Sequence, residues 1–180
     1  MKTLLVLSFL IFSFPLLSEE KPKEGVYKLN SVSIEFQSGT RFGAVKGKFQ
    51  KVSVVKLNVL KKELSLSIDT SSVDTGLGMR DKHLRAEDFF DTGKYPKASF
   101  TLNSLDESSP TRVQAKGLLH LKGKDKPLTF SATKLESDKK LEYKGKLELS
   151  RKEFGMVYDS LINPIEDKVT VIFSLSIDKE

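Results

Sequence analysis

The chain has 180 residues, with 30 Lys and Arg against 24 Asp and Glu, which is enough for one domain with a sizeable core. It has no cysteine, so disulfides, thiolate nucleophiles, thiolate metal sites and cysteine-linked lipid anchors are excluded. The formal charge of +6 is spread in short pairs among apolar residues, without a basic block that has interleaved aromatic residues. Nucleic-acid binding is therefore not expected, whereas an anionic membrane surface is compatible with this charge.

The first 18 residues have the layout of a signal peptide. Lys2 precedes an apolar run that reaches Leu17 with Pro15 inside it, and Ser18 is followed by the charged Glu19. We expect cleavage near Ser18, a short linker over 19–25 and a mature domain over 26–180, in the periplasm or secreted. The alternative is an uncleaved anchor, although the run is short for a membrane span. Cleavage lowers the formal charge from +6 to +5, because the segment holds one lysine and no acid.

Apolar and polar residues alternate with a period of two through most of the chain after residue 25. This pattern is typical of strands with one buried face, and short turn sequences such as Ser38-Gly39 and Asn163-Pro164 separate the segments. Connections this short favour antiparallel neighbours. The sequence therefore predicts an all-β barrel or sandwich of eight or nine strands, with strands around 32–36, 47–49, 52–59, 64–68, 100–102, 113–121, 128–132, 141–149 and 169–177.

The segment from Thr75 to Pro96 breaks the alternation and is too long for a hairpin turn. The spacing of Leu84, Phe89 and Phe90 predicts one or two helical turns, in a short helical loop near residues 79–91. Long ordered loops in compact domains are often functional. Two interpretations stay open: the segment takes part in binding, or its apolar side chains only plug one end of the barrel.

The sequence contains no convincing catalytic or metal-binding constellation. His83 and His120 are the only histidines, and they share no acid cluster. The alternation places His120 on the outer face of its strand. No Gly-x-Ser-x-Gly sequence occurs, and the acids of the 75–96 segment stand among basic residues, as is typical of ion pairs and helix caps. We therefore expect a protein that is not an enzyme and that holds no metal ion and no cofactor.

Phenylalanine is abundant, with 12 residues, while tryptophan is absent. Apart from the signal segment, most of these rings fall on inward positions or beside glycine: Phe36, Phe42, Phe49, Phe89, Phe90, Phe100, Phe130, Phe154 and Phe173. Ordinary core packing accounts for such rings. A closed barrel of about eight strands can also hold one small ligand, so the pattern leaves the state of the interior open.

Three motifs carry a family resemblance, in order along the chain. They lie between Ile68 and Phe100, including Arg80-Asp81-Lys82-His83-Leu84-Arg85, between Gly117 and Leu128, and between Leu149 and Met156. Over nearly the whole mature chain the sequence resembles the YceI-like family of bacterial periplasmic, polyisoprenoid-binding proteins. The resemblance implies a lipocalin-like antiparallel β-barrel of about eight strands. It also implies an apolar tunnel for an isoprenoid chain, with a mouth partly built by residues 80–85.

Together, the pattern and the resemblance predict an exported binding protein that sequesters or carries a polyisoprenoid-type lipid, such as a prenyl quinone or a prenyl phosphate. The isoprenoid lipid is then the partner, and a homodimer is left open. The alternative is a periplasmic interaction protein with a solid barrel core that acts through its surface or through the 75–96 loop. The residues expected at the tunnel or its mouth are the nine phenylalanines named above together with Arg80, Asp81, His83 and Leu84.

Overall fold

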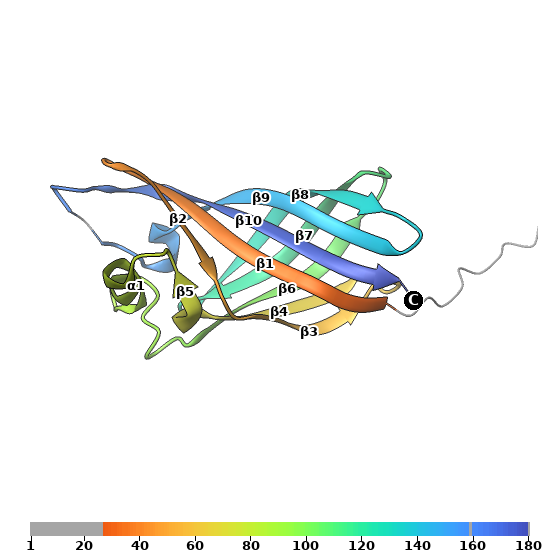
Figure 1. Cartoon of the computed structure of the whole chain (residues 1–180), viewed down its shortest axis with the longest axis horizontal. Coiled ribbons are helices and arrows are strands. Elements are labelled where there is room, and N and C mark those ends of the chain that lie inside the picture. Colours follow the sequence, from red (N-terminus) through yellow and green to blue (C-terminus); the bar gives the residue numbers. More distant parts are fainter. Residues whose placement is uncertain (1–26, 159, 180) are drawn as a thin grey trace, which may run out of the picture.

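The computed structural model describes residues 27–158 and 160–179, which form one curled sheet with a short helix at one end (Figure 1). The expected signal peptide over 1–18 and linker over 19–25 lie outside the described residues. The strands are β1 (Tyr27–Thr40), β2 (Gly43–Phe49), β3 (Val52–Asn58), β4 (Glu63–Asp69), β5 (Val73–Asp74), β6 (Lys97–Asp106), β7 (Arg112–Leu121), β8 (Lys124–Glu136), β9 (Lys140–Ser150) and β10 (Ile165–Lys179). The helical elements are α1 (Gly78–Arg85) and the 3₁₀ turns η1 (Thr70–Ser72) and η2 (Lys152–Phe154). No helix in the described ranges is long and apolar enough to cross a membrane.

The sheet curls because β2 and β3, which follow each other in the chain, lie near opposite ends of the strand order. That order is β3-β4-β6-β7-β8-β9-β10-β1-β2-β5, and the paired neighbours are antiparallel. Only Gln50 and Lys51 separate β2 from β3, yet β2 pairs with β1 while β3 pairs with β4. The two ends of the order therefore meet, and the sheet forms a strongly curled, lipocalin-like half-barrel. The predicted antiparallel, all-β fold class is confirmed.

Two details differ from the sequence-based prediction. The structure has ten strands rather than eight or nine, because Val73 and Asp74 form the short β5, and two residues are too few to show an alternation. The predicted helical loop at 79–91 corresponds to α1, which ends earlier, at Arg85. Ala86 leaves the helical conformation with φ −72° and ψ 172°, and the chain then continues in turns.

The period-two pattern places apolar side chains inside the curled sheet, as β7 shows most clearly. Val113, Ala115 and Leu119 are buried, whereas the intervening Gln114 and His120 are exposed. The outward position predicted for His120 is thus correct. Burial of the inward side chains drives the sheet to close on itself. Their apolar surface is removed from water only when the two edges of the sheet approach each other.

Candidate functional site

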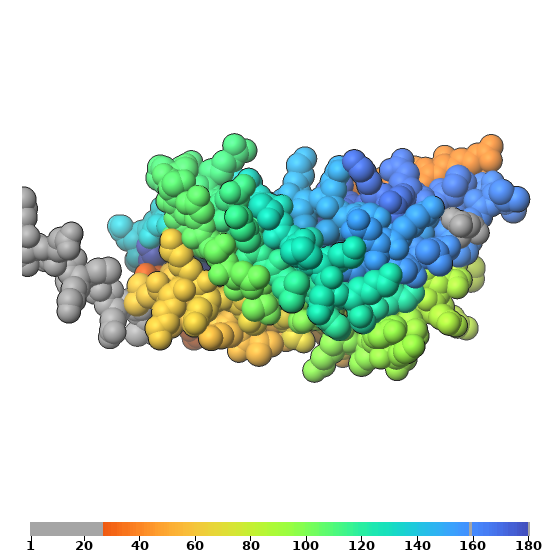
Figure 2. All heavy atoms as spheres, turned by 180° about the vertical axis from the view of Figure 1, so that it is seen from behind, coloured from red at the N-terminus to blue at the C-terminus, as the bar shows by residue number. Residues whose placement is uncertain are grey.

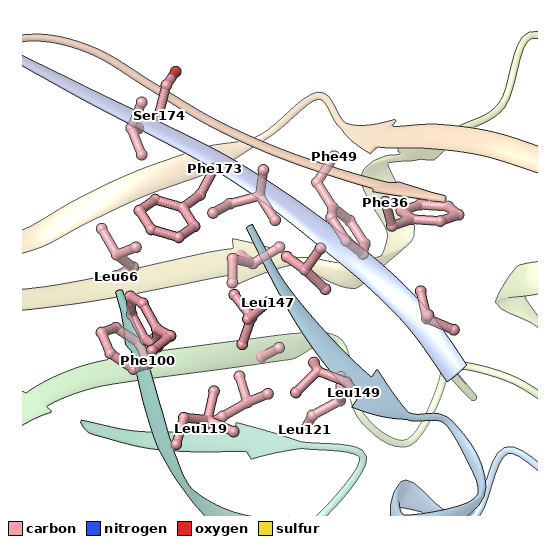
Figure 3. A pocket seen from close by; sticks show the side chains of 18 of the residues that line it. Phe36, Phe49, Leu66, Phe100, Leu119, Leu121, Leu147, Leu149, Phe173 and Ser174 are labelled. Atoms are coloured by element: carbon pink, nitrogen blue, oxygen red, sulfur yellow. The ribbon is translucent and has the colours of Figure 1, made fainter. Parts of the chain in front are cut away.

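The inside of the curled sheet is hollow rather than solid. It contains a cavity of about 650 Å³, lined by α1 and by all the strands except the two-residue β5. Most of the lining is Leu, Val, Ile, Ala and Phe, and Figure 3 shows Phe49, Leu66, Phe100, Leu119 and Phe173 around this space. Small-molecule sites in proteins commonly measure about 300–1,000 Å³. The cavity therefore has the size and the apolar walls of a binding site for an apolar molecule.

Phenylalanine rings form two groups along the cavity. The ring of Phe130 lies 5.8 Å from that of Phe100 and 5.2 Å from that of Phe173, measured between centroids. Nearer α1, Phe49 lies 5.9 Å from Phe36 and 5.4 Å from Phe90. These tilted and edge-on arrangements are favourable for aromatic rings. Rings from six different segments thus meet on the cavity wall, as the sequence predicted for the inward phenylalanines.

Glycines on the inner face give two of these rings their position. A Cβ atom added at Gly117 would lie 2.4 Å from the Phe100 ring, and one added at Gly145 would lie 2.6 Å from the Phe173 ring. Both distances are far shorter than van der Waals contact, so each ring lies directly against the backbone of a neighbouring strand. Because the rings occupy the space of missing side chains, they leave the middle of the barrel open.

The segment between β5 and β6 is anchored at the beginning of α1. Asp81 is buried and accepts hydrogen bonds from the backbone N–H of Thr75, at 2.8 Å, and from the Thr75 hydroxyl. Arg80 donates from Nε to Thr75 Oγ1 at 2.8 Å and from Nη2 to the Thr75 carbonyl at 2.9 Å. Arg85 donates to the carbonyls of Ser71 and Val73 at 2.7 and 2.8 Å. The three charged side chains therefore hold this segment in place by hydrogen bonds to the backbone and to Thr75.

An aromatic cluster covers the same end of the cavity. The His83 ring lies 5.0 Å from the ring of Phe89 and 4.7 Å from that of Tyr158, and both contacts are edge-on. His83 Nε2 also lies 3.8 Å from a carboxylate oxygen of Asp88. Lys122 links the two segments that meet here, since its Nζ donates to the carbonyls of Glu87 and Gly155. Burial lowers the pKa of Lys122.

Polar groups reach the cavity at the α1 end. Arg151 is only 5 % exposed, lines the cavity, and donates to the backbone carbonyls of Glu166, Ile165 and Met156. The Ser38 hydroxyl and Asn163 Oδ1 also belong to cavity-lining residues, and within the described part of the chain neither buried atom has a hydrogen-bond partner. An unpaired buried polar atom is costly. The Ser38 hydroxyl is therefore suited to donate a hydrogen bond to a molecule in the cavity or to accept one from it, and Asn163 Oδ1 is suited to accept one.

At the opposite end, an ion-pair network spans the barrel. Glu107 accepts a hydrogen bond from the Tyr143 hydroxyl at 3.0 Å and pairs with Lys62 and Lys134, both at 3.2 Å. Burial acts to raise the pKa of Glu107, but the hydrogen bonds from Lys134, Lys62 and Tyr143 outweigh it and hold this pKa below its usual value. Burial also raises the pKa of Tyr143, so its hydroxyl stays protonated.

The structure brings together most of the residues that the sequence singled out. Phe36, Phe49, Arg80, His83, Leu84, Phe89, Phe90, Phe100, Phe130, Phe154 and Phe173 all line the one cavity. Phe42 does not line it, because it lies in the turn after β1 with 72 % of its surface exposed. Asp81 does not line it either, since its carboxylate faces Thr75.

Sequence reasoning missed the polar lining residues, which include Ser38, Arg151, Tyr158 and Asn163. A signal existed for Arg151, which continues the inward register of Leu147 and Leu149 two residues further on. Tyr158 and Asn163 follow β9 in a stretch without regular secondary structure, where no alternation predicts direction. Among the described residues, no group of three or more His, Asp or Glu side chains is arranged to hold a metal ion.

A curled antiparallel sheet around an apolar cavity defines a lipocalin-like protein. The model of the YceI-like domain family matches residues 27–177, and the chain belongs to this family. A UPF0312 protein of Shewanella oneidensis is 31% identical over 143 residues, which are 74% of this chain and 71% of that protein. Protein YceI of Escherichia coli O157:H7 is 33% identical over 119 residues, 63% of this chain and 61% of that protein.

Among the solved structures that are similar in fold, one is described by its ligand class. It is a polyisoprenoid binding domain from Saccharophagus degradans, which superposes with a TM-score of 0.70 over 86% of this chain and 98% of its own, at 20% sequence identity. At this identity the likeness concerns the fold. The predicted family and the lipocalin-like architecture are thereby confirmed.

Proposed function

We propose that this protein binds a polyisoprenoid-type lipid in its cavity and sequesters or carries it without chemical change. The observation that carries the proposal is the apolar cavity of about 650 Å³, which is continuous along the inner faces of the strands. A prenyl chain buried there leaves water at roughly 25 cal/mol for each Å² of apolar surface removed. The similarity in fold to a polyisoprenoid binding domain supports this ligand class.

The polar head group of the lipid is proposed to lie at the α1 end. Ser38, Arg151 and Asn163 bring polar atoms to the cavity there, and His83 and Tyr158 border the same space. The Ser38 hydroxyl and the Arg151 guanidinium can donate to a quinone carbonyl or a phosphate oxygen, whereas Asn163 Oδ1 can accept from a hydroxyl of the head group. The chain of the lipid then extends past Phe100, Phe130 and Phe173 toward the opposite end.

Two other functions fit the described residues less well. An interaction protein with a solid core does not match the described residues, because they enclose a cavity. An enzyme acting on the lipid would need a nucleophile and a base beside the cavity. His120 Nδ1 and Asp125 form a short contact of 2.6 Å, but both side chains are exposed, on β7 and β8. Neither residue lines the cavity.

Organic extraction of the purified protein followed by mass spectrometry tests the proposed function. We expect a prenyl lipid to be recovered unchanged and in near-stoichiometric amount. A variant with a charged cavity wall, Phe130→Asp, serves as the comparison and should carry much less. Recovery of no lipid, together with failure of added prenyl quinone and prenyl phosphate to bind, would contradict the proposal. Recovery of a chemically altered lipid would favour an enzyme.

Export is part of the proposal, because a carrier of this kind would act outside the cytoplasm. It is supported by Lys2, by the apolar run that reaches Leu17 and by the charged Glu19 that follows. N-terminal sequencing of protein from the periplasmic fraction and the medium should show a start near Glu19. Protein that remains in the cytoplasm and begins at Met1 would count against export.

A further inference from the structure

Large apolar side chains are exposed together at the α1 end of the barrel. They come from three segments: the turn between β1 and β2, the beginning of α1, and the chain between η2 and β10. Figures 1 and 2 show these segments at the same end of the molecule. We call these side chains the apolar rim; its members are Phe42, Leu77, Met79, Val157, Leu161 and Ile162.

The rim differs from the other exposed apolar residues in being clustered. Val55, Leu60, Leu118, Leu135 and Ile172 are the remaining exposed large hydrophobic residues in the described part of the chain, and they are distributed over β3, the turn after it, β7, β8 and β10. Single exposed apolar residues are normal on soluble proteins, whereas a cluster at one end marks an interaction site. Leu161, at 99 % exposure, is in contact with almost nothing in the molecule itself.

The rim continues directly into the cavity. Leu77 and Met79 are exposed and also line the cavity, so the apolar wall reaches the surface at the start of α1. In the chain before β10, the lining residues Tyr158 and Asn163 alternate with the exposed Val157 and Leu161. At the start of α1, apolar surface therefore extends from the interior to the outside of this end.

Positive charge accompanies the rim. Arg41 precedes Phe42 and is exposed, and the exposed Lys82 lies on α1 one turn after Met79. Neither cation has an acidic partner within 4.0 Å among the described residues. Apolar side chains at projecting turns with cations beside them match a bilayer that has anionic head groups. A protein partner would more often require a broad complementary face.

We propose that the apolar rim inserts into the surface of an anionic lipid bilayer and places the α1 end of the cavity against the membrane. An apolar molecule then passes between membrane and cavity without crossing water, which avoids the cost of exposing it. The inference goes beyond the proposed function, because it depends on the rim and its charge and not on the identity of the ligand in the cavity.

The absence of tryptophan makes a position-specific test available. In the full chain, Leu161→Trp places a single reporter in the rim, and Val55→Trp places a matched reporter at a 70 % exposed position on β3. With vesicles of phosphatidylcholine and phosphatidylglycerol, we expect the emission at 161 to shift to shorter wavelength and to be quenched by brominated acyl chains. The reporter at 55 should do neither. Equal behaviour of the two reporters would overturn the proposal.

Negative charge introduced into the rim gives a second measurement by vesicle co-sedimentation. Leu161→Asp with Ile162→Asp should weaken association roughly tenfold or more, since two apolar side chains that would enter the bilayer are lost, while Val55→Asp should not. Binding that is equally strong on vesicles of phosphatidylcholine alone would overturn the role of charge. If the double variant instead abolishes a dimer detected by light scattering and leaves vesicle association unchanged, the rim is a surface for a second copy and the membrane proposal is wrong.

Discussion

Phe130 shows how a single residue on the cavity wall controls the interior. Its ring lies between those of Phe100 and Phe173, whereas the adjacent Ser131 is exposed on the outer face of β8. A carboxylate at 130 would stand unpaired among these rings, which is costly by several kcal/mol unless the group takes up a proton. We expect Phe130→Asp to lose bound lipid or to unfold, and Ser131→Asp to keep both lipid and melting temperature.

Phe130→Leu helps to distinguish loss of lipid binding from unfolding as the effect of changing residue 130. It keeps an apolar wall with a smaller side chain, so the protein should stay folded and still bind prenyl lipid. Lipid content by mass spectrometry and melting temperature by circular dichroism are the measurements. Equal lipid retention by Phe130→Asp and Ser131→Asp would show that the cavity is not the binding site.

Arg80 was expected at the tunnel or its mouth, and the structure shows that it lines the cavity and also shapes its loop. Its Nε donates a hydrogen bond to the Thr75 hydroxyl, and its Nη2 donates one to the Thr75 carbonyl. We therefore expect Arg80→Ala to lower the melting temperature and to weaken the binding of prenyl diphosphate and prenyl quinone alike. Arg80→Lys should restore little of this loss, because an ammonium cannot make the same pair of hydrogen bonds. A selective loss of diphosphate binding at unchanged stability would identify Arg80 as a head-group ligand instead.

At the scale of elements, α1 depends on hydrogen bonds between its first turn and Thr75, which directly follows β5. Asp81 is buried and accepts two hydrogen bonds from Thr75, so Asp81→Ala leaves the Thr75 N–H without its partner. The expected loss of unfolding free energy is about 1–3 kcal/mol. Hydrogen exchange should accelerate over residues 75–86 more than in the sheet. The exposed Asp88, which lies near His83, provides the control Asp88→Ala, with little change expected.

The elements that the sequence predicted well are those that carry a periodic signal. β7 alternates between buried and exposed residues throughout, and this alternation alone assigns Leu119 inward and His120 outward. Phe42 could not be placed in the same way, because it lies in a turn where no alternation fixes direction. The cavity itself depends on close contacts such as that of Phe100 with Gly117, which join different strands and cannot be derived from spacing along one. The ligand class came from family resemblance and not from the pattern.

For the whole molecule, the two ends of the barrel have different chemistry. The α1 end exposes the apolar rim, and the opposite end is spanned by the pairs of Glu107 with Lys62 and Lys134. Side chains from three separate regions, Lys62 after β3, Glu107 after β6 and Lys134 on β8, meet in these pairs. The network therefore joins side chains from distant parts of the sheet, and its loss should affect global stability and not one loop.

The pH dependence of stability should reveal this network. The pKa of Glu107 is lower in the folded protein than its usual value, because the hydrogen bonds from Lys134, Lys62 and Tyr143 outweigh its burial. A lowered pKa contributes stability that is fully present above the unfolded pKa, about 4.3, and that is lost as the pH falls through the folded value. We expect the melting temperature of the wild type to fall on acidification below about pH 5, with part of that fall due to Glu107.

Glu107→Gln removes the titration and keeps an acceptor for Tyr143. Its melting temperature at neutral pH should be lower than that of the wild type by roughly 5 °C, and the difference should shrink as the pH is lowered, because protonated Glu107 no longer attracts the two lysines. Glu148→Gln removes an exposed carboxylate paired with Lys168 and serves as the matched control, with nearly no effect at either pH. A difference between Glu107→Gln and the wild type that stays constant from neutral to acidic pH would contradict the electrostatic role of Glu107.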